Sequence, residues 1–198
     1  MTKFLTLAAV CALTVLTAGC GTSAPSTFYT LDLTAPPKEK IYKSAQQPVL
    51  GVESVALAAY LDRPQIVLKA ADSPVVTLNE FNRWSESLNT AVARVLSNAV
   101  NQTAKRPYAK PITTSRAPYA YILSVELLRL DADFGKNAVL EAWWTISDKN
   151  DAPVYTMKTV LTHPAGETYD SVVRAENALV TELGKIIASY CLKNLDKK

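Results

Sequence analysis

The stretch VLEAWWTI, residues 139–146, has the alternating pattern of a β-strand with two unlike faces. One face is apolar throughout and carries Leu140, Ala142, Trp144 and Ile146. The other face mixes polar and apolar side chains: Val139, Glu141, Trp143 and Thr145. We predict that the first face is buried against helices. The second is either covered by a loop, such as residues 34–48, or exposed and available to bind a partner.

Two further strands flank this stretch along the chain. Residues 119–130, 138–147 and 154–162 are each rich in the β-branched and aromatic residues that favour strands. Gly135 lies in the first connection and Asp-Lys-Asn-Asp at 148–151 forms the second, and these residue types favour tight turns. Because short turns join antiparallel neighbours, we predict an antiparallel meander.

Two amphipathic helices are predicted around this meander. In residues 81–103 the apolar side chains recur at helical spacing, beginning with Trp84 and Leu88. A second apolar stripe runs through residues 169–195, and Thr168 precedes it as a candidate N-cap. A sheet that buries one face under helices is an α+β fold. We therefore predict a two-layer sandwich of a mostly antiparallel sheet with two amphipathic helices on one face.

Shorter strands are predicted before the first helix. Residues 28–33 and 49–57 have strand patterns, and a proline-containing loop at residues 34–48 separates them. Residues 66–68 and 75–78 flank a turn that contains Pro74, which predicts a short β-hairpin.

The N-terminus has the layout of a secretory signal peptide, with Lys3 followed by an apolar or small run from residue 4 to residue 18. This run is shorter than the roughly 20 residues that a transmembrane helix needs. It leads into Ala18-Gly19-Cys20, which resembles the lipobox of bacterial lipoproteins, where the cysteine is acylated and becomes the first residue of the mature protein. An ordinary cleaved signal peptide that happens to contain Cys20 is the alternative.

The predicted organisation is a lipoprotein signal peptide at residues 1–19, a lipidated tether at 20–27 and a single domain at 28–198. Acyl chains such as palmitate on Cys20 would hold the domain on a membrane without a transmembrane helix. The seven residues after Cys20 reach at most about 25 Å, so the domain must stay close to that membrane. In diderm bacteria the residue after the cysteine helps to sort lipoproteins, and Gly21 resembles the periplasm-facing outer-membrane class.

Charge and cysteine content exclude several classes of function. The net charge is only +3, Lys3 leaves with the signal peptide, and no basic cluster remains, so we expect no nucleic-acid partner. Cys11 also leaves with the signal peptide and Cys20 is consumed by lipid, so Cys191 remains alone and no internal disulfide can form. We expect Cys191 to be a small buried residue on the last helix, with an intermolecular bridge as the alternative.

The sequence offers little support for a catalytic site. The single histidine, His163, precedes Pro164 at a strand end and has no nucleophile motif beside it. We see neither a cluster of metal-ligand residues nor a phosphate-binding glycine loop. Asp131 and Asp133 are interpreted as solvated residues of a turn. The sequence therefore predicts a protein that is not an enzyme and that holds no cofactor and no metal.

Four segments resemble a known family. They are residues 28–31 (FYTL), 50–52 (LGV), 60–67 (YLDRPQIV) and 83–88 (RWSESL). Their order and spacing resemble the PqiC-type (YmbA-like) auxiliary lipoproteins of MCE transport systems, although Ala59, Ser85 and Ser87 depart from the family pattern. The resemblance implies an outer-membrane lipoprotein that assists lipid movement between two membranes. The implied partner is the periplasmic MCE-domain protein of an ABC-type lipid transporter.

Two interpretations of the distinctive motif residues remain open. In the first, Asp62 and Arg63 fix a turn and Trp84 anchors the core at the start of a helix. In the second, an exposed docking site for a partner contains Tyr60, Asp62, Arg63, Arg83 and Trp84, with Trp143 as a further candidate.

Two functions from different classes fit this sequence. The favoured one is a non-enzymatic accessory of an MCE-type lipid transport system that docks the periplasmic MCE protein, and it is compatible with a homo-oligomer. The alternative is a cell-envelope regulatory lipoprotein that binds peptidoglycan or a wall synthase.

Overall fold

The computed structural model describes residues 24–32, 49–116 and 119–196. The predicted signal peptide, Cys20 and the predicted loop at residues 34–48 lie outside these ranges. Within them, neither helix combines the length and the apolar character that crossing a bilayer requires.

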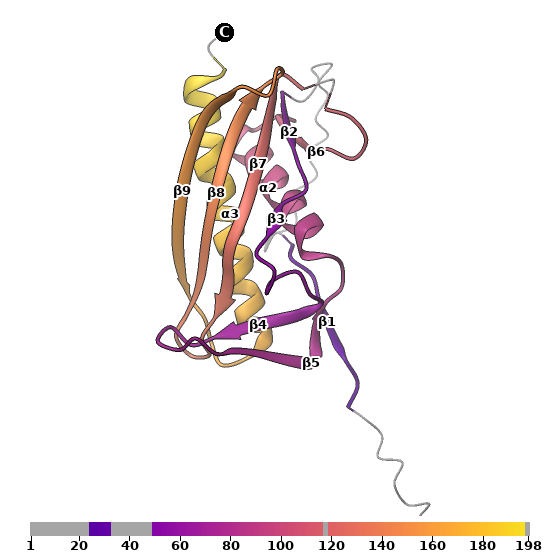
Figure 1. Ribbon diagram of the computed structural model, residues 1–198, viewed down its shortest axis with the longest axis vertical. Coiled ribbons are helices and arrows are strands. Elements are labelled where there is room, and N and C mark those ends of the chain that lie inside the picture. The colour runs from indigo at the N-terminus through magenta and orange to yellow at the C-terminus, as the bar shows by residue number, and fades with distance from the viewer. Residues whose placement is uncertain (1–23, 33–48, 117–118, 197–198) are drawn as a thin grey trace, which may run out of the picture.

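Three long strands form the main part of the sheet: β7 (Tyr121–Ala132), β8 (Asn137–Asp148) and β9 (Pro153–Pro164). β8 lies between the other two and pairs antiparallel with both, so the predicted meander is confirmed. The apolar face of β8 is buried as predicted, at Leu140, Ala142, Trp144 and Ile146. Figure 1 shows the three strands side by side, with the helices behind them.

Three short strands line the other edge of β7: β2 (Leu50–Val52), β3 (Ala56–Leu57) and β4 (Gln65–Lys69). Each runs parallel to β7 and pairs with a successive part of it. The single strand predicted at residues 49–57 is therefore two strands. The ladder is interrupted after Glu53, whose amide donates to the Leu123 carbonyl at 3.0 Å, as the chain follows the twisted edge of β7.

The prediction missed β6 (Ala109–Pro111), which pairs in parallel with β2. A side chain from the preceding helix holds this strand in place. The Asn101 Oδ1 atom accepts hydrogen bonds from the amides of Tyr108 and Ala109, both at 2.7 Å, and its Nδ2 atom donates to the Ala109 carbonyl. β6 is thus held by the side-chain amide of Asn101, eight residues before Ala109. The local sequence pattern of the strand does not reveal this contact.

The predicted hairpin is confirmed, but its second strand, β5 (Val76–Trp84), is longer than expected. β1 (Thr27–Tyr29) pairs with β5 in parallel and is shorter than the predicted strand at residues 28–33. In Figure 1 the β4–β5 hairpin lies across one end of the molecule, the end at which β1 enters it. The complete sheet is mixed, with long antiparallel ladders and short parallel ones.

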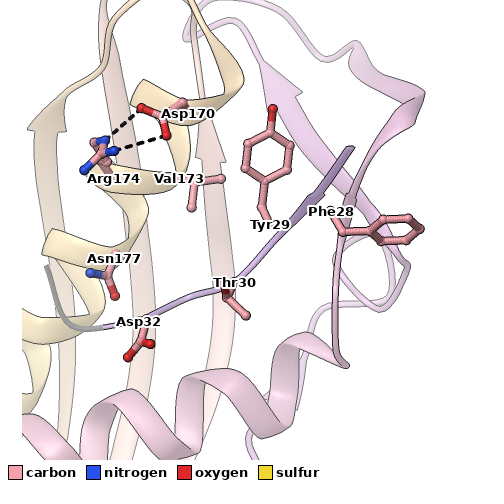
Figure 2. Close-up of a pocket in the computed structure, with 8 residues that line it drawn as sticks. All are labelled: Phe28, Tyr29, Thr30, Asp32, Asp170, Val173, Arg174 and Asn177. Atoms are coloured by element: carbon pink, nitrogen blue, oxygen red, sulfur yellow. Dashed lines mark hydrogen bonds and ion pairs between the residues drawn. The ribbon is translucent and has the colours of Figure 1, made fainter. Parts of the chain in front are cut away.

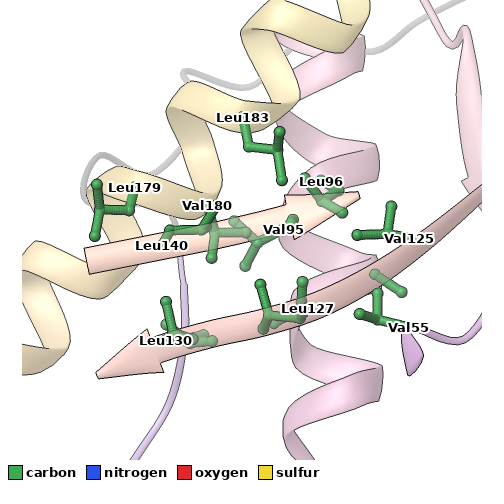
Figure 3. Close-up of a cluster of buried hydrophobic side chains, with 14 of the residues drawn as sticks. Val55, Val95, Leu96, Val125, Leu127, Leu130, Leu140, Leu179, Val180 and Leu183 are labelled. Atoms are coloured by element: carbon green, nitrogen blue, oxygen red, sulfur yellow. The ribbon is translucent and has the colours of Figure 1, made fainter. Parts of the chain in front are cut away.

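The helices α2 (Leu88–Ala104) and α3 (Tyr169–Asn194) cover one face of the sheet, which confirms the α+β sandwich. Figure 3 shows the core between them, where Val95, Leu96, Val180 and Leu183 meet Leu127 and Leu140 of the sheet. Gly184 lets the two helices approach, because a Cβ there would lie 2.5 Å from that of Ala99. The predicted cap is also correct, since the Thr168 hydroxyl accepts from the Ser171 amide at 3.2 Å.

The first helix begins later than predicted. Residues 81–84 belong to β5, because the Trp84 amide donates to the Pro64 carbonyl at 2.7 Å and Trp84 pairs with Tyr29 of β1. Chain segments on both sides thus hold the backbone of Trp84 in an extended conformation. The helix starts only after Ser87, whose backbone is extended at φ −64° and ψ 132°.

Candidate functional site

The face of the β7–β9 sheet that points away from the helices is exposed over much of its area among the described residues, although Asp131 at one end of it is buried and bonds to Tyr60. Residues that pair directly across adjacent strands share a face, so the register identifies its members. We call this the open face and define it as Glu126, Glu141, Trp143, Thr145, Val154, Thr156, Lys158 and Val160. Figure 1 looks onto it. Trp143 is exposed among the described residues, while the loop at residues 34–48, predicted as a possible cover, lies outside them.

Trp143 is the large aromatic side chain of the open face. It is 42% exposed and lies between Glu126 and Lys158 on the neighbouring strands. The Lys158 ammonium lies 5.9 Å from the centroid of the indole ring and 2.6 Å from the Glu141 carboxylate. Val160, paired with Glu141, is 57% exposed. The face therefore offers apolar area around a charge pair, a combination typical of protein-binding surfaces.

Tyr60 is held in the structure by a buried carboxylate. Its hydroxyl lies 2.9 Å from Asp131 Oδ2 and 3.2 Å from the Leu128 carbonyl, and both can accept its proton. Asp131 is buried and also accepts from Arg129 at 2.7 Å. Burial, followed by the nearby Asp131 charge, raises the pKa of Tyr60. The interaction thus joins the segment before β4 to β7.

The prediction that Asp131 is a solvated turn residue is wrong. β7 extends through Ala132, and Asp131 lies inside the strand. Its charge is compensated by Arg129, two residues earlier on the same face, and by Tyr60, which is 71 residues away in sequence. Asp133 does lie in the turn and pairs with Lys136 at 2.8 Å.

The predicted turn-fixing pair of Asp62 and Arg63 does not form within the described part of the chain. Backbone bonds hold this turn instead: the Leu61 amide donates to Ala58 and the Arg63 amide donates to Leu61, both at 2.8 Å. Asp62 is exposed to solvent. Because the amides already satisfy the turn, it needs no side-chain pair.

Trp84 and Arg83 separate into different environments at the end of β5. Trp84 is buried and does anchor the core, although in a strand rather than a helix. Arg83 is half-buried, and in the strand register it lies opposite Phe28 of β1 and Gln65 of β4. The Nε atoms of Arg83 and Arg63 are buried and have no hydrogen-bond partner among the described residues.

A cavity of about 330 Å³ lies between the segment after β1 and the first turns of α3. Its lining is mainly polar and comprises Phe28, Tyr29, Thr30, Asp32, Asp170, Val173, Arg174 and Asn177. Figure 2 shows Asp170 and Arg174 joined to each other, while the Phe28 ring points away from the other labelled side chains. The Arg174 bond at 2.8 Å lowers the pKa of Asp170. The polar lining suits a small polar ligand rather than an acyl chain.

Glu176 of α3 is a buried acid that the sequence did not single out. Neither carboxylate oxygen has a hydrogen-bond partner among the described residues. Burial, with a smaller contribution from the Asp131 charge, raises the pKa of Glu176 well above its usual value. Burial thus favours the neutral, protonated form of this side chain. Its position within the apolar stripe of α3 was the available signal, because a Glu among apolar residues at helical spacing must be buried.

Cys191 and His163 are two further side chains of reactive type. Cys191 is buried on α3 as predicted, and burial raises the pKa of its thiol to about 12. His163 is exposed near the end of β9, with its Nδ1 atom 2.9 Å from the Pro164 carbonyl. Within the described ranges, no three His, Cys, Asp or Glu side chains are placed to hold a metal.

Arg94 links the N-terminal segment to α2 and was also missed. It donates to the Leu31 carbonyl at 2.9 Å and pairs with Glu86 and Asp32. The local sequence pattern shows only that Arg94 lies off the apolar stripe of its helix. This bond holds Leu31 in the core just after β1.

The chain matches a family model and is similar to solved structures. The model of the family described as ABC-type transport auxiliary lipoprotein component matches residues 29–188. An uncharacterized protein of known crystal structure is similar with a TM-score of 0.68 and 16% identity, over 84% of this chain and 98% of that one. A protein from Xanthomonas campestris is similar with a TM-score of 0.63 and 16% identity, over 84% and 95% of the two chains. No curated protein matches the sequence.

The two structural likenesses have low identity and show the fold alone. The family match covers most of the chain, from β1 into α3, and confirms the resemblance to PqiC-type lipoproteins. The chain therefore belongs to the family of ABC-type transport auxiliary lipoprotein components.

Proposed function

We propose that this protein is an outer-membrane lipoprotein, anchored through Cys20 and facing the periplasm, that docks the periplasmic MCE-domain protein of an ABC-type lipid transporter. It acts by binding and not by catalysis. The observation that carries the proposal is the open face, a sheet surface that the described residues leave exposed around Trp143, in a member of a transport-auxiliary family.

The lipid anchor is supported by the family and by the N-terminal sequence. The family consists of lipoproteins, and Cys20 follows small residues at the end of an apolar run. A domain held only by acyl chains on its first residue is free to present its surface to a partner in the periplasm.

The open face has the chemistry of a docking surface. Tryptophan contributes large binding energies because it buries much area with few rotatable bonds. Trp143 and Val160 provide apolar area, while the ion pair of Lys158 and Glu141 provides polar contacts beside them. We propose that the MCE-domain protein covers this face. Tyr60 and Trp84, in contrast, are engaged in the fold and are not part of the proposed docking site.

A binding role is also supported by the state of the acidic groups. Arg129 neutralises Asp131, and Arg174 pairs with Asp170. The Arg174 bond lowers the pKa of Asp170, and a carboxylate with a lowered pKa is a weaker general base near neutral pH. These groups stabilise the molecule instead of activating a substrate.

Photo-crosslinking in cells tests the proposal. A crosslinking amino acid replaces Val160 on the open face, and the matched control replaces exposed Lys185 on α3. We expect an adduct from position 160 that mass spectrometry identifies as the MCE-domain protein, and no such adduct from position 185. An adduct of a wall synthase, or of the MCE-domain protein from position 185 alone, would contradict the proposal.

A further inference from the structure

The large apolar side chains that the described residues expose gather, apart from Met157, on two surfaces. Trp143, Val154 and Val160 lie on the open face, while Met157, which pairs with Trp144, lies on the opposite face of β9. The remaining five belong to β1, the β4–β5 hairpin and the turn between β7 and β8. We call them the tether-end surface: Phe28, Val75, Leu78, Phe81 and Phe134. Phe28 and Val75 are the most exposed, at 62% and 63%.

The segments of the tether-end surface meet at one end of the molecule. Phe28 pairs with Arg83 at the end of β5. The turn of the hairpin contacts the β7–β8 turn, because the Ala71 amide donates to the Asp133 carboxylate. Phe134 lies edge-on to Tyr169 at the start of α3, with ring centroids 5.2 Å apart. In Figure 1 the hairpin lies across this end, and β1 enters there.

We infer that the tether-end surface rests on the lipid leaflet that holds the acylated N-terminus. The inference rests on the proposed attachment of lipid at Cys20. It adds a membrane-contacting surface within the folded domain and an orientation that the anchor alone does not fix.

The tether between Cys20 and β1 is short, which argues that the tether-end surface contacts the lipid leaflet. Residue 20 and Thr27 are seven residues apart, so even a fully extended chain places the start of β1 within about 25 Å of the acyl chains. β9 runs for 12 residues, and Val154 lies about 33 Å along it from the strand end nearest the β7–β8 turn. The tether therefore brings the tether-end surface, and not the far end of β9, to the leaflet.

The chemistry of the surface fits a lipid interface. Exposed phenylalanine and aliphatic side chains enter the boundary between headgroups and acyl chains. Arg83 lies beside Phe28 on the paired strands and can donate to a lipid phosphate while its stem stays apolar. Residues 62–83 contain three basic and three acidic residues, so the contact is apolar rather than polybasic. Adhesion should accordingly be insensitive to the fraction of anionic lipid.

Fluorescence on the acylated full-length protein in phosphatidylethanolamine–phosphatidylglycerol vesicles tests this inference. An environment-sensitive NBD label is attached to Val75→Cys, and the matched control carries it on Val154→Cys, another exposed valine. Cys191 is buried and Cys20 is acylated, so each variant offers one reactive thiol. We expect a blue-shifted emission at position 75 and at least threefold stronger quenching by spin-labelled lipid than at position 154.

The possible outcomes distinguish failure of the membrane contact from failure of the proposed lipid anchor. Equal quenching at positions 75 and 154 in protein that floats with the vesicles overturns the membrane contact and leaves the anchor intact. A blue shift at position 75 without quenching by lipid indicates contact with a second copy and also overturns it. Protein that fails to float and lacks the mass of acyl chains overturns the anchor, and with it the inference.

Discussion

Trp143 and Trp144 are neighbours in the sequence with opposite surroundings. Trp144 is 1% exposed, donates from Nε1 to the Thr159 hydroxyl at 3.0 Å and contacts the rings of Tyr155 and Tyr190. Trp143, on the other face, is 42% exposed and has the Lys158 ammonium 5.9 Å from the centroid of its ring. Two identical side chains thus show that strand alternation, rather than residue type, separates the folded core from the proposed binding surface.

The helix-covered side and the open face of the sheet also differ in the surroundings of their acidic side chains. On the covered side, Glu176 is buried without a hydrogen-bond partner among the described residues, and burial raises its pKa. On the open face, Glu141 remains paired with Lys158 at the surface. Substitutions on the covered side should therefore change stability, and those on the open face should change binding.

Replacing Trp144 by alanine should have the largest effect. It removes a buried aromatic side chain together with its bond to Thr159, so we expect a loss of about 3–5 kcal/mol in the free energy of unfolding. Chemical denaturation measures the loss. Trp143→Ala is the matched control and should change stability by no more than about 0.5 kcal/mol. Similar losses for both variants would show that the two faces are not distinct.

Replacing Glu176 by glutamine should change how stability depends on pH. The raised pKa means that the folded protein keeps this proton while the unfolded chain releases it above about pH 4.5, so this group makes the protein less stable as pH rises. The slope is about 1.36 kcal/mol per pH unit until the pKa of the folded state is reached. Between pH 5 and pH 7, Glu176→Gln should thus gain stability relative to the native protein. An unchanged difference at the two pH values would contradict this.

Replacing Tyr60 by phenylalanine should have an intermediate effect. The change removes the hydroxyl that bonds to buried Asp131, and a hydrogen bond to a charged group contributes about 1.5–3 kcal/mol. Thermal unfolding should show the loss, with binding of the MCE-domain protein unchanged. A variant that folds normally but fails to bind would place Tyr60 in the docking site and widen that site beyond the open face.

Regular alternation and spacing made much of the fold predictable. The meander, the buried face of β8, the hairpin and the last helix with its Thr168 cap follow from local patterns. The start of α2 does not, because the four-residue spacing of Trp84 and Leu88 fits a helix as well as it fits a strand end followed by a helix. Only the distant partners Tyr29 and Pro64 decide the matter.

The candidate site was less predictable for the same reason. Asp131 resembles a turn residue until Arg129 and Tyr60 are seen to compensate its charge. The motif residues of 60–84 were considered together, yet Tyr60 and Trp84 have roles within the fold and Arg83 lies near the end of the molecule beside Phe28. Trp143 was identified by alternation, but sequence could not decide whether anything covers it.

The affinity of the Trp143→Ala variant for the periplasmic part of the MCE-domain protein tests the central claim most directly. The variant should bind at least tenfold more weakly, a difference of about 1.4 kcal/mol, with an unchanged unfolding midpoint. Lys185→Ala, on the exposed side of α3, should bind as the native protein does. Native affinity in the Trp143→Ala variant would contradict docking through the open face.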